Sequence, residues 1–146
     1  MADHWTIKLE TIFTDYLSTI STATIPETVQ KVASRSTAAR TRPTLVMEID
    51  GERPNSNYIV NANLTLHVLT NADDTTDAQA ASWSKAAADF VRDEAAWMAW
   101  TATKTTTYRT GWAIRKKWLG EFDVETDEDA HTRDTKQTIS LAVEID

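Results

Sequence analysis

The chain has 146 residues, of which 22 are acidic and 15 are basic, so its formal net charge is −7. A chain of this length buries roughly 70% of the surface that its unfolded form exposes, and residues 1–146 are expected to form a single domain. The absence of cysteine excludes disulfides, thiolate nucleophiles and thiolate metal sites, and three widely separated glycines exclude the glycine-rich loops that bind nucleotide phosphates.

The charge and the hydropathy also disfavour two kinds of partner. The N-terminal sequence MADHWTIKLE lacks the basic region and the apolar run of a signal peptide, and no apolar stretch approaches the roughly 20 residues that cross a bilayer. We therefore expect no membrane association. Nucleic-acid binding depends on basic side chains that release counterions, and the mild basic clusters at 35–42 and 115–117 are not dense enough to provide it.

The first 20 residues predict an amphipathic helix over residues 3–20, with Asp3 placed to cap it. Spacings of three and four put Trp5, Leu9, Ile12, Phe13, Tyr16 and Ile20 on one face. A second, shorter helix is predicted near Pro26, because proline favours a first helical turn. Residues 34–43, SRSTAARTRP, lack apolar periodicity and predict a basic mobile linker or assembly arm.

Two strands follow in the sequence. Residues 44–50 alternate between apolar and polar side chains and predict a short strand that ends at Asp50-Gly51. The loop GERPNSN leads to residues 58–69, where the alternation over a dozen positions predicts the clearest strand of the chain. Its apolar face would consist of Tyr58, Val60, Ala62, Leu64, Leu66 and Val68.

An Ala-rich helix is predicted from about Asp74 to Trp97 or Trp100. Its stripe comprises Ala80, Trp83, Ala87, Phe90, Val91, Glu94, Trp97 and Met98. Strands at about 112–125 and 137–145 would follow, joined by the loop at 126–135. Trp112, Ile114, Trp118, Phe122 and Val124 would share one face of the first, and Gln137, Ile139, Leu141, Val143 and Ile145 one face of the second.

The predicted order is helix, strand, strand, helix, strand, strand. Two hairpins joined by a long helix indicate an α+β fold, with a mostly antiparallel four-stranded sheet and helices packed on one face. One-sided strands are typical of antiparallel sheets that have one covered face.

Three aspartates lie close together between the predicted strand and helix, in Asp73-Asp74-Thr75-Thr76-Asp77. The spacings from Asp74 to Asp77 and from Thr76 to Gln79 fit helix capping, in which a side-chain oxygen accepts from an N–H of the first turn. Carboxylates there also complement the helix dipole, each by about 0.3–1 kcal/mol. A Mg²⁺ or Ca²⁺ site is the alternative, but the glycine and glutamate spacing of a calcium loop is absent.

Histidines and hairpin acids are the other candidate site residues. No two of His4, His67 and His131 lie four residues apart on a helix, so the zinc-protease pattern is missing. We expect His67 to be an exposed sheet histidine, with a general base as the alternative. The hairpin loop Asp127-Glu128-Asp129-Ala130-His131, with Asp134 beyond it, is interpreted as solvated, with a weak divalent-cation site or contact with a basic partner as alternatives. No catalytic or metal-binding residue and no cofactor is predicted.

Six tryptophans are unusual for this length and are candidates for core or interface positions. Trp83, Trp112 and Trp118 lie on predicted apolar faces and are expected in the core. Trp97 and Trp100 lie three residues apart near a helix end, so exposure of one of them at an interface is the alternative to burial of both.

The layout of the chain and one local motif resemble a known family. A helix and a short strand precede YIVNANLTLHVLT, the strand-to-helix turn NADDTTDAQAASWSKAAADF follows, and the chain ends in the strand KQTISLAVEID. This order and this turn resemble the tail terminator, or tail completion, proteins of long-tailed bacteriophages. The resemblance covers residues 44–146 and, loosely, the N-terminal helix.

The resemblance implies a structural virion protein and no enzyme. Such proteins form a homo-oligomeric ring, usually a hexamer, which caps the head-proximal end of the tail tube, ends tube polymerisation and joins tail to head. The implied partners are the tail-tube protein and a head-side neck protein, and the implied location is the tail or neck of a virion assembled in the host cytoplasm. DNA would at most pass through an acidic lumen.

Polar positions of the predicted sheet and loops are then the candidate subunit or tube contacts. They are Arg40, Arg42, Glu52, Arg53, His67, Trp100, Arg115, Lys117, Glu121, Asp123, Asp127, Glu128, Asp129 and His131. Another neck component, such as a head-completion or stopper protein, is the alternative within the same class. A small cytoplasmic enzyme or ligand-binding α+β domain that uses the polar sheet face is the alternative from another class.

Overall fold

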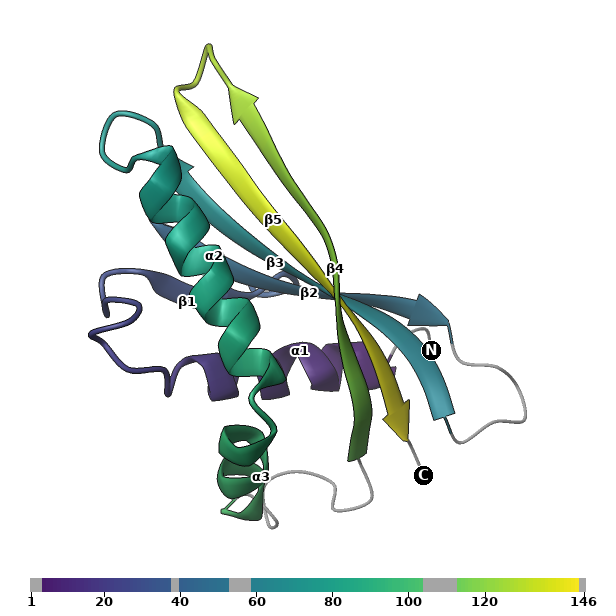
Figure 1. The fold of residues 1–146 in the computed structure, drawn as a ribbon. Helices are drawn as coiled ribbons and strands as arrows, with labels where there is room; N and C mark the ends of the chain where they lie inside the picture. Colours follow the sequence, from purple (N-terminus) through teal and green to yellow (C-terminus); the bar gives the residue numbers. More distant parts are fainter. Residues whose placement is uncertain (1–3, 38–39, 53–58, 104–112, 145–146) are drawn as a thin grey trace.

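A computed structural model describes residues 4–37, 40–52, 59–103 and 113–144, with the backbone alone at 4–5, 52, 59–60, 113–117 and 144 (Figure 1). The chain is α+β, as predicted. Its elements are α1 (His4–Leu17), β1 (Gln30–Ala33), β2 (Thr44–Glu52), β3 (Ile59–Asn71), α2 (Asp77–Arg92), α3 (Glu94–Ala102), β4 (Ala113–Asp127) and β5 (Thr132–Glu144).

The strands form one sheet in the order β1-β2-β3-β5-β4. The three pairs β2–β3, β3–β5 and β5–β4 are antiparallel, which confirms the two predicted hairpins and their adjacency. The predicted count of four strands is wrong, because β1 adds a fifth strand that runs parallel to β2. The sheet is therefore mixed.

The short strand β1 also replaces most of what was predicted after the first helix. Among the described residues, 21–29 contain turns and no α-helix, so the helix predicted near Pro26 is wrong. Ile25 and Val29 are instead buried in the core from a turn conformation. Pairing with β2 satisfies the backbone of 30–33, for which a helix of that length would leave most terminal N–H and C=O groups unbonded.

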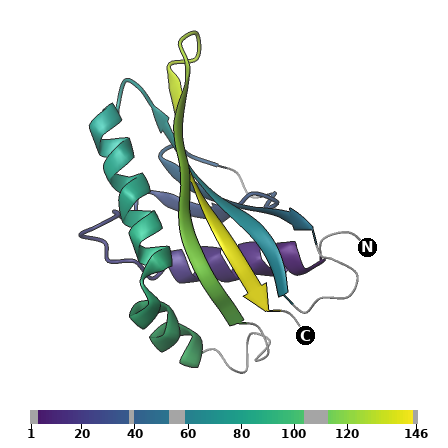
Figure 2. The ribbon, with the colours of Figure 1, turned by 45° about the vertical axis from the view of Figure 1, so that its right-hand side comes forward.

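Alternation along the central strands separates a core face from a polar face. One hydrophobic cluster joins alternate residues of β2, β3 and β5 to the buried stripes of α1 and α2 and to Trp97 of α3. α1 packs against β1 and β2 and runs across the strands, whereas α2 packs against β3 and β5 and runs along them (Figure 2). The predicted inward residues are confirmed at Leu9, Ile12, Phe13, Tyr16, Ile20, Ala62, Leu64, Leu66, Val68, Gln137, Ile139, Leu141 and Val143.

The predicted single helix is two helices that meet at Asp93. Asp93 ends α2, and its side chain accepts a hydrogen bond from the N–H of Ala96 at 3.1 Å, so the same residue caps the start of α3. The helix α2 begins later than predicted: Thr76 is its N-cap, and the Thr76 side chain accepts a hydrogen bond from the N–H of Gln79 at 3.1 Å. Asp74 is exposed and precedes this cap, because residues 71–75 form a turn first.

Five aromatic side chains pack together and join α1 to the junction of α2 and α3. The Tyr16 and Phe90 rings stack at 4.3 Å between centroids, and the Tyr16 hydroxyl donates to the Phe90 carbonyl at 2.8 Å. Trp97 is 8% exposed and contacts Phe13 and Tyr16. Trp100 is half-buried against Tyr16 and Trp97, so both tryptophans contribute to packing.

The edge strand β4 differs most from its predicted pattern. Leu119 pairs with Ile139, and Phe122 pairs with Gln137. Between these two pairs, β4 has two residues where β5 has one, so β4 forms a β-bulge. The bulge reverses the alternation, so Trp118 and Phe122 point to opposite faces. Trp118 is 50% exposed, which contradicts its predicted core position. The helices leave the core-face side of β4 uncovered, and Leu119, Phe122 and Val124 are 51%, 51% and 42% exposed.

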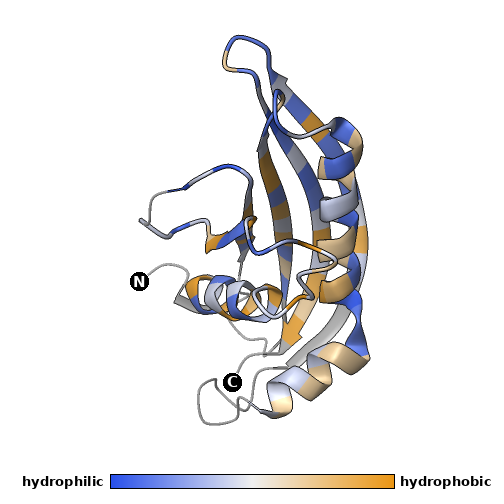
Figure 3. Ribbon diagram, turned by 90° about the vertical axis from the view of Figure 1, so that its left-hand side faces the viewer, coloured by the Kyte–Doolittle hydropathy of each residue, from blue (hydrophilic) through white to orange (hydrophobic). Residues whose placement is uncertain are grey.

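The hairpin between β4 and β5 is tighter than the loop predicted at 126–135. Both strands continue into that range, and only residues 128–131 form the turn. His131 closes the turn with a φ of 54°, and its carbonyl accepts from the N–H of Ala72 at 2.7 Å. The tip of this hairpin is hydrophilic, as the hydropathy colouring shows at the upper end of the molecule (Figure 3).

Candidate functional site

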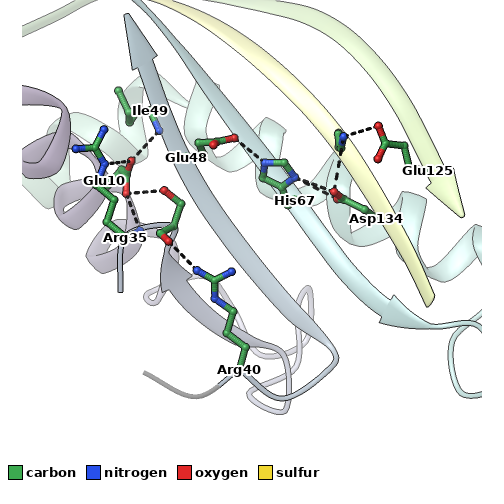
Figure 4. A network of polar contacts seen from close by, with 10 residues as sticks. Glu10, Arg35, Arg40, Glu48, Ile49, His67, Glu125 and Asp134 are labelled. Atoms are coloured by element: carbon green, nitrogen blue, oxygen red, sulfur yellow. Dashed lines mark hydrogen bonds and ion pairs between the residues drawn. The ribbon is translucent and has the colours of Figure 1, made fainter. Parts of the chain in front are cut away.

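The polar face of the sheet brings charged residues of four strands into one row (Figure 4). His67 of β3 is its centre: Nε2 lies 2.9 Å from Glu48 Oε1 on β2, and Nδ1 lies 3.1 Å and 3.2 Å from the two carboxylate oxygens of Asp134 on β5. Lys136 continues the row, 3.8 Å from Asp134 and 2.8 Å from Glu125 on β4. Charges of opposite sign therefore alternate across the sheet.

The contacts of His67 favour its protonated form. Both ring nitrogens face carboxylates, and only the imidazolium has an N–H on each nitrogen. Burial lowers the pKa of His67, but the hydrogen bonds and charges of Asp134 and Glu48 outweigh it and raise the pKa above the ordinary value of 6.5. The predicted exposed histidine is therefore largely enclosed, with a side chain only 17% exposed. As an imidazolium it joins strands, and in this form it lacks the lone pair that a general base needs.

Lys136 shows the same kind of electrostatic support. The hydrogen bond that Lys136 donates to Glu125 raises the pKa of Lys136 above the ordinary lysine value, despite an opposing contribution from burial. The charges of Asp134 and Asp123 add to the increase. Lys136 therefore remains a cation between the acids of β4 and β5.

A second polar centre is buried near the β1 edge of the sheet, where the pairing of β1 with β2 ends. Glu10 of α1 is 1% exposed, and its carboxylate accepts from the Ser34 hydroxyl at 2.9 Å, from the Arg35 N–H at 3.3 Å and from the Ile49 N–H at 3.1 Å. Arg35 Nε lies 3.4 Å from the same carboxylate. Parallel pairing of β1 with β2 ends at Ala33 and Met47, so Glu10 bonds the next free N–H of β2 in place of a longer β1.

Two clefts flank this Glu10–Arg35 centre. One, of about 370 Å³, lies between α1 and β1, with Ile7, Val32 and Ala33 as apolar lining and Lys31, Arg35 and Asp15 as charged lining. The other, of about 390 Å³, opens on the polar face and is lined by Glu48, Asp50, Asn63, Thr65 and Thr138 beside Ser34. Both clefts are open, and the first combines apolar lining with basic side chains.

Arg40 and Arg42 are both tied back to the chain. Arg40 is exposed and donates to the Ser34 carbonyl at 2.7 Å. Arg42 donates to the carbonyls of Thr70 and Arg133 at 3.2 Å and 3.5 Å, next to the polar row. Within the predicted assembly arm, Arg40 therefore contacts the residue that follows β1, whereas Arg42 reaches the backbone of β3 and β5.

The predicted acidic residues gather on the β4–β5 hairpin. Glu121 and Asp123 are exposed on β4, Asp127 ends that strand, and Glu128, Asp129 and His131 are exposed in the turn. Asp127 accepts from the N–H of Ala130 at 3.1 Å and so shapes the turn. Arg53 lies outside the described residues, as do the side chains of Glu52, Arg115 and Lys117.

Several residues of the two polar centres were not singled out from the sequence. Glu10 had a usable signal, because it lies three residues before Phe13 on the apolar stripe of α1, where a carboxylate needs buried partners. Glu48 and Lys136 became recognisable only through the strand register, which also places Asp134, a residue noted beside the acidic hairpin loop, next to His67. In the part of the chain that the structure describes, no three histidine or acidic residues are grouped to hold a metal ion.

Comparison with known proteins identifies the fold. No protein-family model matches the chain, and no curated protein matches it. Among solved structures, a chain from the "virion of native gene transfer agent (GTA) particle" superposes with a TM-score of 0.66 at 11% sequence identity. The match covers 97% of this chain and 99% of the other. The two chains share one fold.

That agreement extends over the whole described architecture. A match of this extent includes the helices, the mixed sheet and the hairpin, and it leaves little of either chain over.

In the described ranges, no helix has the length and apolar character that a membrane span requires.

Proposed function

We propose that this chain is a structural virion protein that forms a ring on the head-proximal end of a phage-type tail tube. The ring ends tube polymerisation and offers the surface to which the head is joined. Its partners are further copies of the same chain, the tail-tube protein and a head-side neck protein. The chain acts by assembly and without a cofactor or a catalytic step.

The observation that carries the proposal is the end-to-end fold match to a chain of a gene transfer agent virion. The match covers 97% of this chain and 99% of the other. The strand-to-helix turn at residues 71–79, on which the resemblance to tail terminators rests, has the capping structure at Thr76. Fold and local motif thus agree on a virion component.

The surface of the molecule supports assembly as its mode of action. Trp118, Leu119, Phe122 and Val124 are each 42% to 51% exposed on an edge strand, and exposed apolar residues that cluster on an edge mark interaction sites. The polar face uses its charges in ion pairs across strands, and both ring nitrogens of its histidine lie against carboxylates of neighbouring strands. These features fit a subunit contact better than a reaction centre.

The proposal is tested by measuring assembly. The purified protein, alone and mixed with the tail-tube protein encoded near it, is examined by mass photometry and negative-stain electron microscopy. We expect rings, either free or seated on one end of each tube, and tubes that stop growing where a ring is bound. A chain that remains monomeric and leaves tube length unchanged contradicts the proposal.

A deletion of the gene separates this role from that of another neck component. Without a protein that ends polymerisation, tubes should grow past their normal length and carry no heads. Without a head-completion or stopper protein, tails should keep their normal length and remain separate from heads. Electron microscopy of particles from the deletion strain distinguishes the two outcomes.

A further inference from the structure

A segment at each edge of the sheet has a strong charge of one sign. The hairpin half of the edge strand β4 and its turn contain six acids and no base between residues 121 and 129: Glu121, Asp123, Glu125, Asp127, Glu128 and Asp129. The bases of β4, Arg115, Lys116 and Lys117, lie in its other half. The other edge, β1 and the segment that follows it, contains four bases and no acid between residues 30 and 43: Lys31, Arg35, Arg40 and Arg42. The strand order places these two segments at the two ends of the sheet.

Each edge also has an apolar feature that the monomer leaves uncovered. On β4, Leu119 and Phe122 are each 51% exposed, and acids alternate with the apolar residues around them. At the β1 edge, the lining of the cleft of about 370 Å³ includes Ile7 and Val32, the bases Lys31 and Arg35 and the acids Glu10 and Asp15. Ile7 is itself 45% exposed. A projecting apolar strand with acids thus has a counterpart in a cleft with apolar lining, beside the basic segment at 30–43.

We propose that the β4 edge of one copy docks into the cleft between α1 and β1 of the next copy. This inference rests on the proposed ring and assigns its subunit contact. Phe122 and Leu119 enter the cleft beside Ile7 and Val32. The acids of β4, Glu121 and Asp123 first, then lie beside Lys31 and Arg40 of the neighbour.

Charge selects this head-to-tail contact over a symmetric one. A symmetric contact centred on the acidic half of β4 would bring the six acids of one copy against the six of another, and like charges across strands are destabilising. A head-to-tail contact uses two different surfaces, so each copy keeps one free edge for the next copy. Repetition of such a contact closes a ring when the rotation between neighbouring copies is a full turn divided by a whole number.

The absence of cysteine from the chain permits a direct cross-linking test. Ile7→Cys and Phe122→Cys are made as separate variants and then co-expressed, and a short bismaleimide cross-linker is added. We expect a cross-linked dimer in the mixture and none from either variant alone. A dimer from Phe122→Cys alone indicates a symmetric contact and overturns the inference.

Charge reversal tests the same contact through assembly. The double variant E121K/D123K should raise the midpoint concentration of ring assembly about tenfold or more, because several rim charges then repel the neighbour. Adding K31E/R40E to the same chain should restore assembly, since the charges are then exchanged. The matched control D73K/D74K changes two exposed acids outside the proposed contact and should leave assembly within about twofold of the wild type.

The outcomes separate this inference from the proposed function. A wild-type protein that forms rings, while its two cysteine variants fail to cross-link or E121K/D123K behaves like D73K/D74K, contradicts only the assigned contact. A wild-type protein that stays monomeric, alone and with the tail-tube protein, contradicts the proposed function as well. Circular dichroism of each variant shows that a loss of assembly does not come from unfolding.

Discussion

The carboxylate of Glu10 lies 3.1 Å from the backbone nitrogen of Ile49 and accepts its hydrogen bond, so a helix side chain continues the edge of the sheet where β1 stops. The same carboxylate also bonds Ser34 and Arg35. One buried group thus joins α1, the end of β1 and the middle of β2. Stability should depend on it more than on any exposed ion pair.

Glu10→Ala should lower the free energy of unfolding by about 2–3 kcal/mol, because it leaves the buried Ile49 N–H without a partner. Arg35→Ala should cost about 1 kcal/mol, because the Arg35 side chain is 43% exposed and the Glu10 carboxylate keeps its hydrogen bonds from Ser34 and from two backbone N–H groups. Urea denaturation followed by circular dichroism measures both. Equal losses for the two variants would show that the ion pair, and not the backbone contact, stabilises this edge.

The enclosed His67 predicts that stability decreases as the pH rises. Its pKa is raised in the folded protein, so the folded state holds the proton more tightly than the unfolded state. The resulting stabilisation is fully present below the unfolded value of about 6.5 and is lost as the pH rises through the folded pKa. Wild-type protein should therefore lose more stability than His67→Gln between about pH 6 and about pH 8.5.

Urea titrations at the two pH values measure that difference. His131→Asn is the control, because it removes an exposed histidine of the turn, keeps every His67 contact and tolerates the positive φ. It should show the same dependence as the wild type. A dependence that is unchanged in His67→Gln would place its origin elsewhere.

The cap of α2 predicts a difference between two neighbouring residues. Thr76→Ala removes the acceptor for the Gln79 N–H and should cost about 1 kcal/mol, within the usual range of about 0.5–2 kcal/mol. Asp74→Ala, two residues earlier and exposed, should change stability by no more than about 0.5 kcal/mol. Thermal unfolding of both variants, with and without Mg²⁺ or Ca²⁺, checks this. A cation-dependent increase in stability that disappears in Asp74→Ala would instead indicate a metal site.

The aromatic cluster predicts a strong and a weak variant at one location. Trp97→Ala should cost about 3–5 kcal/mol, because Trp97 is buried and its removal leaves a large cavity. Tyr16→Phe should cost about 1 kcal/mol, since it loses only the hydrogen bond to the Phe90 carbonyl. Burial, with Asp93 and Glu94 nearby, raises the pKa of Tyr16 to about 12, so this bond persists at neutral pH. Equilibrium denaturation compares the two, and a smaller loss for Trp97→Ala than for Tyr16→Phe would contradict the packing described.

The sequence predicts long regular elements well and short or interrupted ones poorly. β3 and β5 are visible because alternation persists over 13 residues in each. β1 has only four residues, QKVA, too few to show a period, and its parallel pairing depends on β2, which lies ten residues further along the chain. The division at Asp93 is hidden because the apolar stripe continues from Val91 to Trp97 across the break.

The candidate site was predictable only in part, for a related reason. Sequence periodicity correctly places His67 on the polar face, but its partners come from strands whose order and register follow from folding. Glu48 and Asp134 lie 19 and 67 residues away in the chain. Phe122 is exposed because the helices pack mainly against β1, β2, β3 and β5 and leave β4 uncovered. No local sequence pattern around Phe122 predicts which strands a helix covers.

The bulge in β4 limits how this strand can change over time. It holds Gly120, where an added Cβ would lie 3.0 Å from the Thr138 carbonyl oxygen, so a larger residue there would require the neighbouring strand to shift slightly. Removal of one residue between Leu119 and Phe122 would leave the pairs Leu119–Ile139 and Phe122–Gln137 in place, so both side chains would stay on the core face. An insertion or deletion elsewhere in β4 would shift the register and turn the residues on one side of it to the opposite face. Changes of length in this strand should therefore accumulate at the bulge, whereas the rest of the strand should change by replacement of residues.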